Sequence, residues 1–239
     1  MLTSIQLIVD SFPTLMQGAL LTLGVGVIAL LISLLLGMVI ALFRLSKLRL
    51  LKVIGTAYTT IIRGIPELVL LLLIFYGGQE FINNWRFEWA DARGIAVDAI
   101  NFSPFWAGAI VIGLIYTAYM AETLRGAMLA VSGGQLEAAR AYGLGPVRIF
   151  FRITFPQMIR HALPGISNNW LVMLKATALV SLIMLSDVVE LSFAMGKSTH
   201  HQLTFLSFAA LVFLLFTSVS VLIFRYLEAR YSIGFIRKT

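Results

Sequence analysis

The sequence predicts an all-α integral membrane protein with five transmembrane helices, arranged as a single domain over residues 1–239. Two observations lead to this expectation. Hydrophobic residues make up 59% of the chain and charged residues only 12%, and several uncharged runs reach the roughly 20 residues that cross about 30 Å of hydrocarbon. This composition is unlike that of an ordinary soluble domain. The basic residues that give the net charge of +7 are therefore first assigned to one side of the membrane, before nucleic-acid binding is considered as their role.

The first uncharged run extends from Ser11 to Phe43 and predicts a span over 14–43. Asp10 precedes the run, and the basic residues that follow it are Arg44, Lys47, Arg49 and Lys52. A cleaved signal peptide carries positive charge before its apolar core, whereas here the charge follows. Because Lys and Arg favour the cytoplasmic side, we expect the segment to stay in the protein with its N-terminus outside.

The second span, over 53–78, is interrupted by Arg63, Gly64, Pro66 and Glu67. It is predicted to be kinked or to begin as an interfacial helix. Residues 80–101 follow as a polar outer loop with an acidic excess. Its aromatic residues, Trp85, Phe87 and Trp89, are interpreted as interfacial anchors, with contact to an external binding protein as the alternative.

Three further spans are predicted over 102–131, 166–186 and 203–226. Lys175 lies near the middle of the fourth, where it needs a carboxylate, a carbonyl or water. A structural pairing is expected, with contact to the α-carboxylate of a substrate as the alternative. The last uncharged run ends at Phe224, and the basic residues that follow it are Arg225, Arg230, Arg237 and Lys238. An odd number of spans places the C-terminus in the cytoplasm, in agreement with this charge.

The longest polar insert, residues 133–164, has the pattern of two short helices. Residues 135–142 are good helix formers that end at Gly143, as a helix C-terminus often does. A second helix is expected to start at Pro146 and to stop at Pro156. The basic residues of the whole insert alternate with apolar residues; they are Arg140, Arg148, Arg152 and Arg160. A surface that is both charged and apolar favours contact with a partner protein.

This insert resembles the EAA loop of ABC importer permeases through Glu137-Ala138-Ala139, Gly143 and Ile153-Thr154-Phe155-Pro156, with Phe155 where that family usually has Leu. Three more stretches resemble the polar amino-acid importers: Arg63-Gly64-Ile65-Pro66, Ala121-Glu122-Thr123-Leu124-Arg125-Gly126 and Lys175-Ala176-Thr177-Ala178-Leu179. The chain is most similar to the Q-type permeases for histidine, lysine, arginine, ornithine or opines. The resemblance implies a type I ABC importer permease fold with a cytoplasmic coupling helix. The residues it assigns to ATPase coupling are Gln135, Glu137, Ala138, Ala139, Arg140, Gly143 and Pro156.

The same resemblance implies a set of partners in a bacterial inner membrane. These are a second, similar permease subunit, which makes a heterodimer, two ATPase subunits carrying ATP and Mg, an external solute-binding protein and membrane lipid. No cofactor, metal or enzymatic activity is expected in this chain. Met195–Thr199 looks like a phosphate-binding loop, but Leu191 stands where that motif needs a glycine.

The residues considered for substrate binding are Glu67, Arg63, Tyr119, Glu122 and Asn169. A carboxylate near the membrane needs a cation or water, so Glu67 either attracts a cationic substrate group or pairs with Arg63 one turn away. Glu122 and Arg125 are expected to pair with each other or to brace a gate. Tyr119 and Asn169 either line the path or bond between helices.

We therefore expect an ATP-driven permease for a polar, basic amino acid. Two alternatives remain open from the sequence. One is a secondary transporter driven by an ion gradient, with Glu67, Glu122 and Lys175 as ion sites, although the absence of an inverted repeat speaks against it. The other is a membrane scaffold that recruits a cytosolic protein through residues 133–164.

Overall fold

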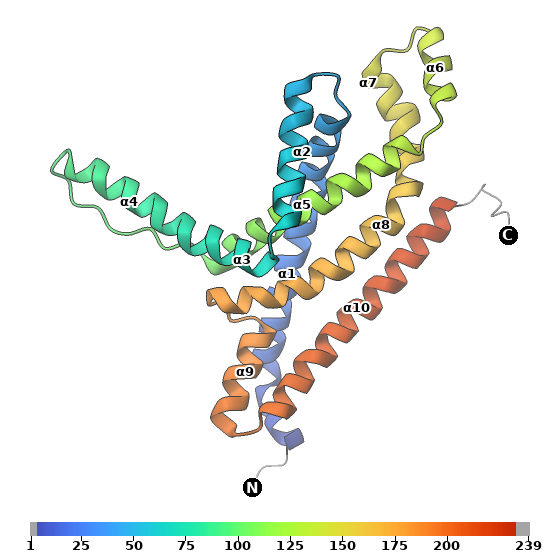
Figure 1. Ribbon diagram of the computed structural model, residues 1–239. Coiled ribbons are helices and arrows are strands. Elements are labelled where there is room, and N and C mark those ends of the chain that lie inside the picture. Colours follow the sequence, from blue (N-terminus) through green and yellow to red (C-terminus); the bar gives the residue numbers. More distant parts are fainter. Residues whose placement is uncertain (1–3, 233–239) are drawn as a thin grey trace.

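The computed structural model describes residues 4–232, which form helices and connecting turns without any strand. Arg237 and Lys238, used above to orient the chain, lie outside this range. Four helical stretches are long and apolar enough to cross a membrane, or five if one bent pair counts as a span. The four are α1 (Ser4–Leu45), α5 (Pro104–Leu129), residues 146–183 and α10 (Gln202–Ser232) (Figure 1).

The centre of the fold is the pairing of α1 with α5. Small residues let the two backbones approach closely, which is how helices associate in lipid. A Cβ added to Gly113 would lie 2.8 Å from the Ile32 side chain and 3.3 Å from the Ala29 carbonyl oxygen. A Cβ on Gly37 would meet Met120 at 2.9 Å. Close approach at both points fixes the register of α5 against α1.

The predicted second span, 53–78, is not one straight helix. Helix α2 (Arg49–Gly64) ends before Ile65, which is extended at φ −107° and ψ 138°. Helix α3 (Glu67–Leu72) then starts after Pro66, and the chain bends by 108°. Proline lacks an N–H and excludes the α conformation from the residue before it. The expected kink is therefore a sharp break.

Residues 80–101 are not simply a loop, as the sequence had suggested. A π-helical segment (Leu73–Gly77) joins α3 to α4 (Gly78–Asp91), which projects from the bundle (Figure 1). The returning chain is bonded to α4: Asn83 donates to the Ile100 carbonyl at 3.0 Å and accepts from the Ile100 N–H at 2.7 Å. Trp85 is 62% exposed and Trp89 45%. Both remain available as interfacial anchors.

The second helix of the insert does start at Pro146, but Pro156 does not stop it. Helix α7 (Pro146–Ile149) passes through a π-helical segment (Phe150–Thr154) into α8 (Phe155–Ala176). The Phe155 N–H bonds to the Phe150 carbonyl, five residues back. The wide turn changes the bonding pattern just before the proline, so its missing N–H falls in the first turn of α8. A 3-10 segment (Thr177–Ile183) completes this stretch.

Asp187 lies just beyond the predicted fourth span, and the structure buries it completely. Its Oδ1 atom caps α9 (Val188–Thr199) by accepting the Glu190 N–H at 2.8 Å. Burial raises the pKa of Asp187 to about 6, although hydrogen bonds from backbone N–H groups act in the opposite direction. Asp187 is therefore a structural cap rather than part of a solvated outer face.

The two ends of the bundle differ in what they carry. The turn between α1 and α2, α6 (Gly133–Ala141), α7 and the end of α10 all lie toward one end (Figure 1). The start of α1 and the connection from α9 to α10 lie at the other. The predicted coupling insert thus shares its end with the basic turn at residues 44–52.

Candidate functional site

Helix α6 is an exposed knob held to the bundle by few side chains. Gly143 adopts φ +77°, a conformation that favours glycine, and its N–H bonds to the Arg140 carbonyl at 2.9 Å. Ala139 is only 4% exposed, and Leu136 packs against the apolar cluster beneath the helix. The predicted helix and its glycine stop are therefore both present. The turn at Gly143 and the packing of Leu136 together set the orientation of α6.

The outer surface of this knob is uncovered. Glu137, Ala138 and Arg140 are exposed, and Tyr142 at the tip is 88% exposed. Of the other predicted coupling residues, Gln135 accepts a hydrogen bond from Gln157 at 2.6 Å, and Pro156 lies exposed at the start of α8. An exposed aromatic ring beside charged side chains is typical of a surface that binds another protein.

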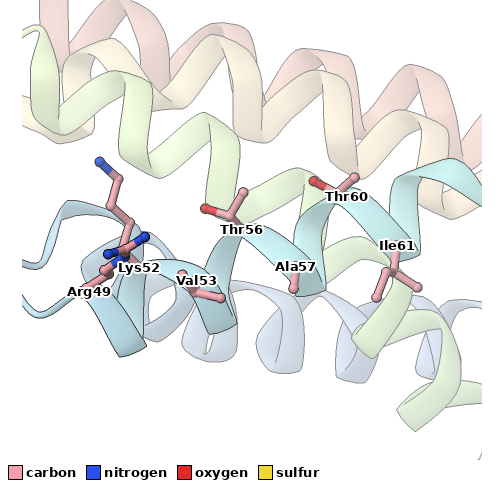
Figure 2. A pocket seen from close by; sticks show the side chains of 7 residues that line it. All are labelled: Arg49, Lys52, Val53, Thr56, Ala57, Thr60 and Ile61. Carbon is pink, nitrogen blue, oxygen red and sulfur yellow. The ribbon is translucent and has the colours of Figure 1, made fainter.

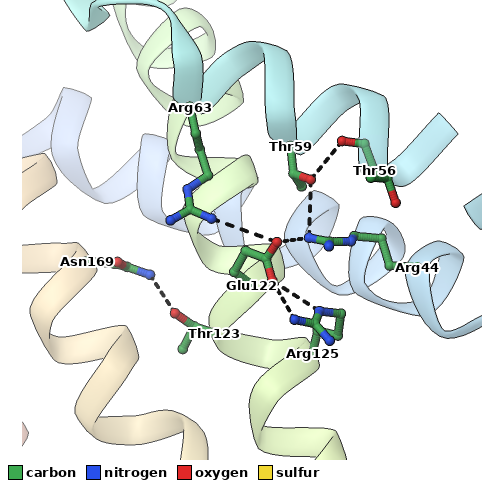
Figure 3. Close-up of polar contacts among 8 residues, drawn as sticks. All are labelled: Arg44, Thr56, Thr59, Arg63, Glu122, Thr123, Arg125 and Asn169. Atoms are coloured by element: carbon green, nitrogen blue, oxygen red, sulfur yellow. Dashed lines mark hydrogen bonds and ion pairs between the residues drawn. The ribbon is translucent and has the colours of Figure 1, made fainter. Parts of the chain in front are cut away.

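A second polar site surrounds Glu122 on α5. Its carboxylate forms ion pairs with three arginines that come from α1, α2 and α5 itself: Arg44, Arg63 at 3.8 Å and Arg125 at 3.0 Å (Figure 3). Arg44 also donates to the Thr59 hydroxyl at 3.2 Å. The predicted pairing of Glu122 with Arg125 is confirmed. The sequence predicts Arg44 only as a basic residue that follows the first span, so its ion pair with Glu122 appears only in the structure.

This cluster ties three helices together at one point. The side chain of Glu122 is 23% exposed and that of Arg63 is 46% exposed. One carboxylate facing three guanidinium groups leaves an excess of positive charge, so the loosest partner, Arg63, is available to an approaching anion. The arrangement suits a brace that holds α1, α2 and α5 at fixed spacing.

Glu67 does not pair with Arg63, although both belong to the predicted substrate set. The break at Pro66 separates them. Glu67 instead accepts hydrogen bonds from the Tyr116 hydroxyl at 3.1 Å and 3.2 Å. Arg63 lies over the Tyr119 ring, 5.2 Å from its centre. Because Tyr116 and Tyr119 are neighbouring rings on α5, the structure brings Glu67, Arg63 and Tyr119 to one face of that helix.

Asn169 extends this face onto α8. Its amide donates to the Thr123 hydroxyl at 3.0 Å, next to Glu122 (Figure 3). All the predicted substrate residues therefore lie on α5 or on α2, α3 and α8, three helices that contact it. Only the fold shows that the Tyr116 hydroxyl donates to the Glu67 carboxylate.

Lys175 departs from expectation. A structural pairing was predicted, yet its side chain is exposed and makes no hydrogen bond or ion pair with any residue of the range 4–232. It lies in the last turn of α8. Lys175 has no partner in this range because the opposite face of α8 is the buried one. The Lys175 side chain therefore points outward.

A shallow groove of about 600 Å³ runs along the outside of α2. Its lining comes from that helix alone, beginning with Arg49 and Lys52 and ending at Ile61 (Figure 2). None of the predicted substrate residues lines it. The groove is therefore separate from the polar face of α5.

The comparisons with known proteins decide the family. Residues 33–233 match the model of the binding-protein-dependent transport system inner membrane component. The chain belongs to this family. Its relatives in the family include the histidine/lysine/arginine/ornithine transport system permease protein HisQ of Salmonella typhimurium, 46% identical over 220 residues, covering 92% of this chain and 94% of HisQ.

Two other permeases of this family are also similar over nearly their whole length. The arginine ABC transporter permease protein ArtQ of Escherichia coli K12 is 38% identical, covering 92% of this chain and 96% of ArtQ. The octopine transport system permease protein OccQ of Agrobacterium tumefaciens is 35% identical, covering 90% and 89%. These relatives confirm the resemblance to Q-type permeases of polar amino-acid importers.

Solved structures confirm the fold. The crystal structure of an amino acid ABC transporter with histidines contains a chain that matches with a TM-score of 0.80 and 28% identity, covering 96% of this chain and 99% of that one. An inward-facing methionine transporter, MetNI, matches with a TM-score of 0.66 at 14% identity, covering 95% and 97%. The chain has the type I ABC importer permease fold of these proteins.

Proposed function

We propose that this chain is the membrane-spanning subunit of an ATP-driven importer for a basic amino acid in a bacterial inner membrane. The observation that carries the proposal is the rigid, uncovered α6 knob on a permease fold, together with relatives whose names specify basic amino acids and opines. The chain provides the substrate path and the helix that receives the movement of the ATPase. ATP hydrolysis takes place on separate subunits that carry ATP and Mg. No cofactor is assigned to this chain.

The helix that receives this movement is α6. An ATPase subunit that grips Glu137, Arg140 and the exposed Tyr142 can move the knob as one body, because Gly143 and Leu136 fix it to the bundle. Movement there is transmitted to α5 and α8, which are packed against each other. Such rigid-body motion is the usual basis of alternating access.

The polar face of α5 is the substrate path in this proposal. Glu67 attracts the guanidinium, ammonium or imidazolium group of the amino acid, while Tyr116 holds its carboxylate in place. Arg63 and Tyr119 lie beside it, and Asn169 continues the polar surface. The Glu122 cluster braces the path at the coupling end.

The orientation and partners follow from this arrangement. Five spans, with the bent α2–α3 stretch as one, place the N-terminus outside and the C-terminus in the cytoplasm. The α6 end carries the basic turn at residues 44–52, which supports a cytoplasmic position. One knob serves one ATPase subunit, so the importer contains a second, similar permease, a second ATPase and an external binding protein.

Uptake in proteoliposomes tests the proposal. The chain is purified with its co-expressed permease and ATPase, and radiolabelled L-arginine uptake is measured with and without ATP and the binding protein. We expect uptake only when both are present. Uptake that follows an imposed ion gradient without ATP would refute it, as would the absence of uptake of arginine, lysine, histidine and ornithine.

Glu67→Gln tests the cation site. The substitution keeps the size of the side chain but removes its charge, so uptake of L-arginine should fall by about tenfold, equivalent to ~1.4 kcal/mol. Glu80→Gln, an exposed carboxylate on α4, is the control and should retain uptake. Wild-type uptake in the Glu67→Gln importer would exclude this carboxylate from substrate attraction.

A further inference from the structure

The exposed face of α8 carries a polar stripe. His161, Asn168 and Lys175 follow each other at seven-residue intervals, and two helical turns return a side chain to nearly the same direction. All three are exposed, and Val172 on the same face is 42% exposed. At 1.5 Å per residue the stripe runs for about 21 Å along the helix, which is most of a membrane crossing.

The opposite face of α8 is apolar and buried. Trp170, Met173 and Leu174 belong to the main core, and Trp170 donates to the Ser220 hydroxyl of α10 at 2.8 Å. These contacts with neighbouring helices fix the rotation of α8. The outward direction of Asn168 and Lys175 is therefore set by the fold.

Lipid is a poor environment for this stripe. Lys175 lies within the apolar stretch 146–183 and has no partner among residues 4–232. A lysine that faces hydrocarbon within a membrane helix is strongly disfavoured, because its charge loses its hydration there. Polar residues within membrane segments generally face water-filled cavities or other helices. This cost therefore favours water over lipid along the stripe.

We propose that the α8 stripe lines the aqueous substrate path and that Lys175 binds the α-carboxylate of the transported amino acid. The inference rests on the proposed function. The 3-10 segment that follows Lys175 packs against α3, the helix that starts at Glu67, and Tyr76 beyond α3 donates to the Leu182 carbonyl at 3.3 Å. Lysine and glutamate thus belong to neighbouring elements, as a ligand with an α-carboxylate at one end and a cationic side chain at the other requires.

The absence of cysteine from the sequence allows a clean test of water access. Single substitutions Asn168→Cys and Val172→Cys are made in the complete importer, with Leu214→Cys and Leu222→Cys on α10 as controls. The control positions are 60% and 65% exposed in the chain but lie among apolar residues. A charged methanethiosulfonate reagent should label the two stripe positions at least about tenfold faster, because the reagent and the reactive thiolate both need water.

Val172→Cys is the decisive position, since its own side chain is apolar. Fast labelling there supports a water-lined face, and a rate no higher than that of Leu214→Cys overturns the inference. The latter result would mean that lipid or the second permease covers the stripe. Binding-protein-dependent uptake by the unmodified importer is measured alongside, so that failure of the proposed function is recognised separately.

The carboxylate assignment is tested with two ligands. L-Arginine should slow labelling of Val172→Cys in the absence of the binding protein, whereas agmatine, which has no carboxylate, should protect several-fold less. In Val172→Cys/Lys175→Gln this difference should disappear, and in Val172→Cys/Lys175→Arg it should persist, because arginine keeps the charge. A difference that survives in the glutamine variant would overturn the role of Lys175.

A chemical rescue separates charge from structure. Lys175→Cys should transport poorly, and reaction with 2-aminoethyl methanethiosulfonate should restore much of the uptake, because it attaches an ammonium group to the thiol. Methyl methanethiosulfonate, which adds no charge, should restore none. Equal rescue by both reagents would show that Lys175 acts through packing and would refute a carboxylate contact.

Discussion

Helices α5 and α6 are separated by only a short turn, yet their environments are opposite. Helix α5 is buried along most of its length, with residues such as Ile115, Ala118 and Met120 at 0–2% exposure. Helix α6 buries Ala139 and exposes most of its other side chains. Helix α5 is covered mostly by other helices of this chain, whereas no residue of the range 4–232 covers the outer face of α6.

Because of this difference, substitutions in the two helices are expected to have different effects. A change in α5 acts on the free energy of unfolding, because it disturbs packed neighbours. A change on the outer face of α6 leaves the fold intact and acts on assembly. Each variant below has a matched control at a position where the opposite result is expected.

Gly113→Leu should have the largest effect. Even a Cβ would lie 2.8 Å from Ile32, so the larger side chain forces α1 from α5 at a cost of about 3 kcal/mol or more. Thermal unfolding of the purified complex measures the loss. Gly126→Leu on the same helix, where a Cβ meets nothing within 4 Å, should unfold near the wild-type temperature. Equal effects at both positions would contradict the packing of α1 on α5.

Glu122→Gln should come next. The three arginines around it lose their only carboxylate partner within residues 4–232, and their mutual repulsion then loosens the junction of α1, α2 and α5. Because the site is partly exposed to water, we expect a loss of about 2 kcal/mol rather than the full cost of a buried pair. Denaturant unfolding provides the measurement. The exposed Glu88→Gln should change stability little, and a similar result for Glu122 would argue against a brace.

Glu137→Arg should leave stability within about 0.5 kcal/mol, as expected for an exposed position. Its effect is on coupling: ATP hydrolysis stimulated by the loaded binding protein should fall by about tenfold, or ~1.4 kcal/mol. Glu88→Arg on α4 makes the same charge change on an exposed helix outside the insert. Normal stimulated hydrolysis in Glu137→Arg would exclude this residue from the ATPase contact.

Gly143→Ala should have the smallest effect. Its φ of +77° strains a residue with a Cβ by about 1 kcal/mol, and the strain is confined to the end of α6. Amide hydrogen exchange should therefore quicken in α6, with global unfolding unchanged. Gly134→Ala is the control, because Gly134 has no positive φ and a Cβ there would make only an ordinary contact, 3.9 Å from the Ser132 hydroxyl oxygen. Protection of α6 identical in both variants would show that the turn does not depend on glycine.

Much of the fold was predictable because long apolar runs have few solutions in a membrane. The helices of the uncharged runs, the α6 helix and its stop at Gly143 follow from local patterns. The sequence predicts a kink near Pro66 but not its angle. The 108° bend depends on what α3 packs against. The continuation through Pro156 was missed because π-helical turns have no clear sequence signal.

The candidate site was predicted in part. Glu122 and Arg125 are three residues apart on one helix, so their pairing could be read directly from the sequence. Arg44 and Tyr116 could not be assigned in this way. Arg44 contacts Glu122 and Tyr116 contacts Glu67, and both partners are far away in the sequence. Only the packing of the helices brings them together. The same packing decided that Glu67 and Arg63 have different partners.

The sequence by itself determined that the chain is helical and apolar and that it carries a polar insert with the residues of a coupling helix. These properties depend on local spacing and on the exclusion of unpaired backbone from lipid. The tertiary structure decided which side of each helix is covered. That choice depends on the rotation of α5 and α8 against their neighbours, and it left Lys175 pointing outward with no partner among residues 4–232.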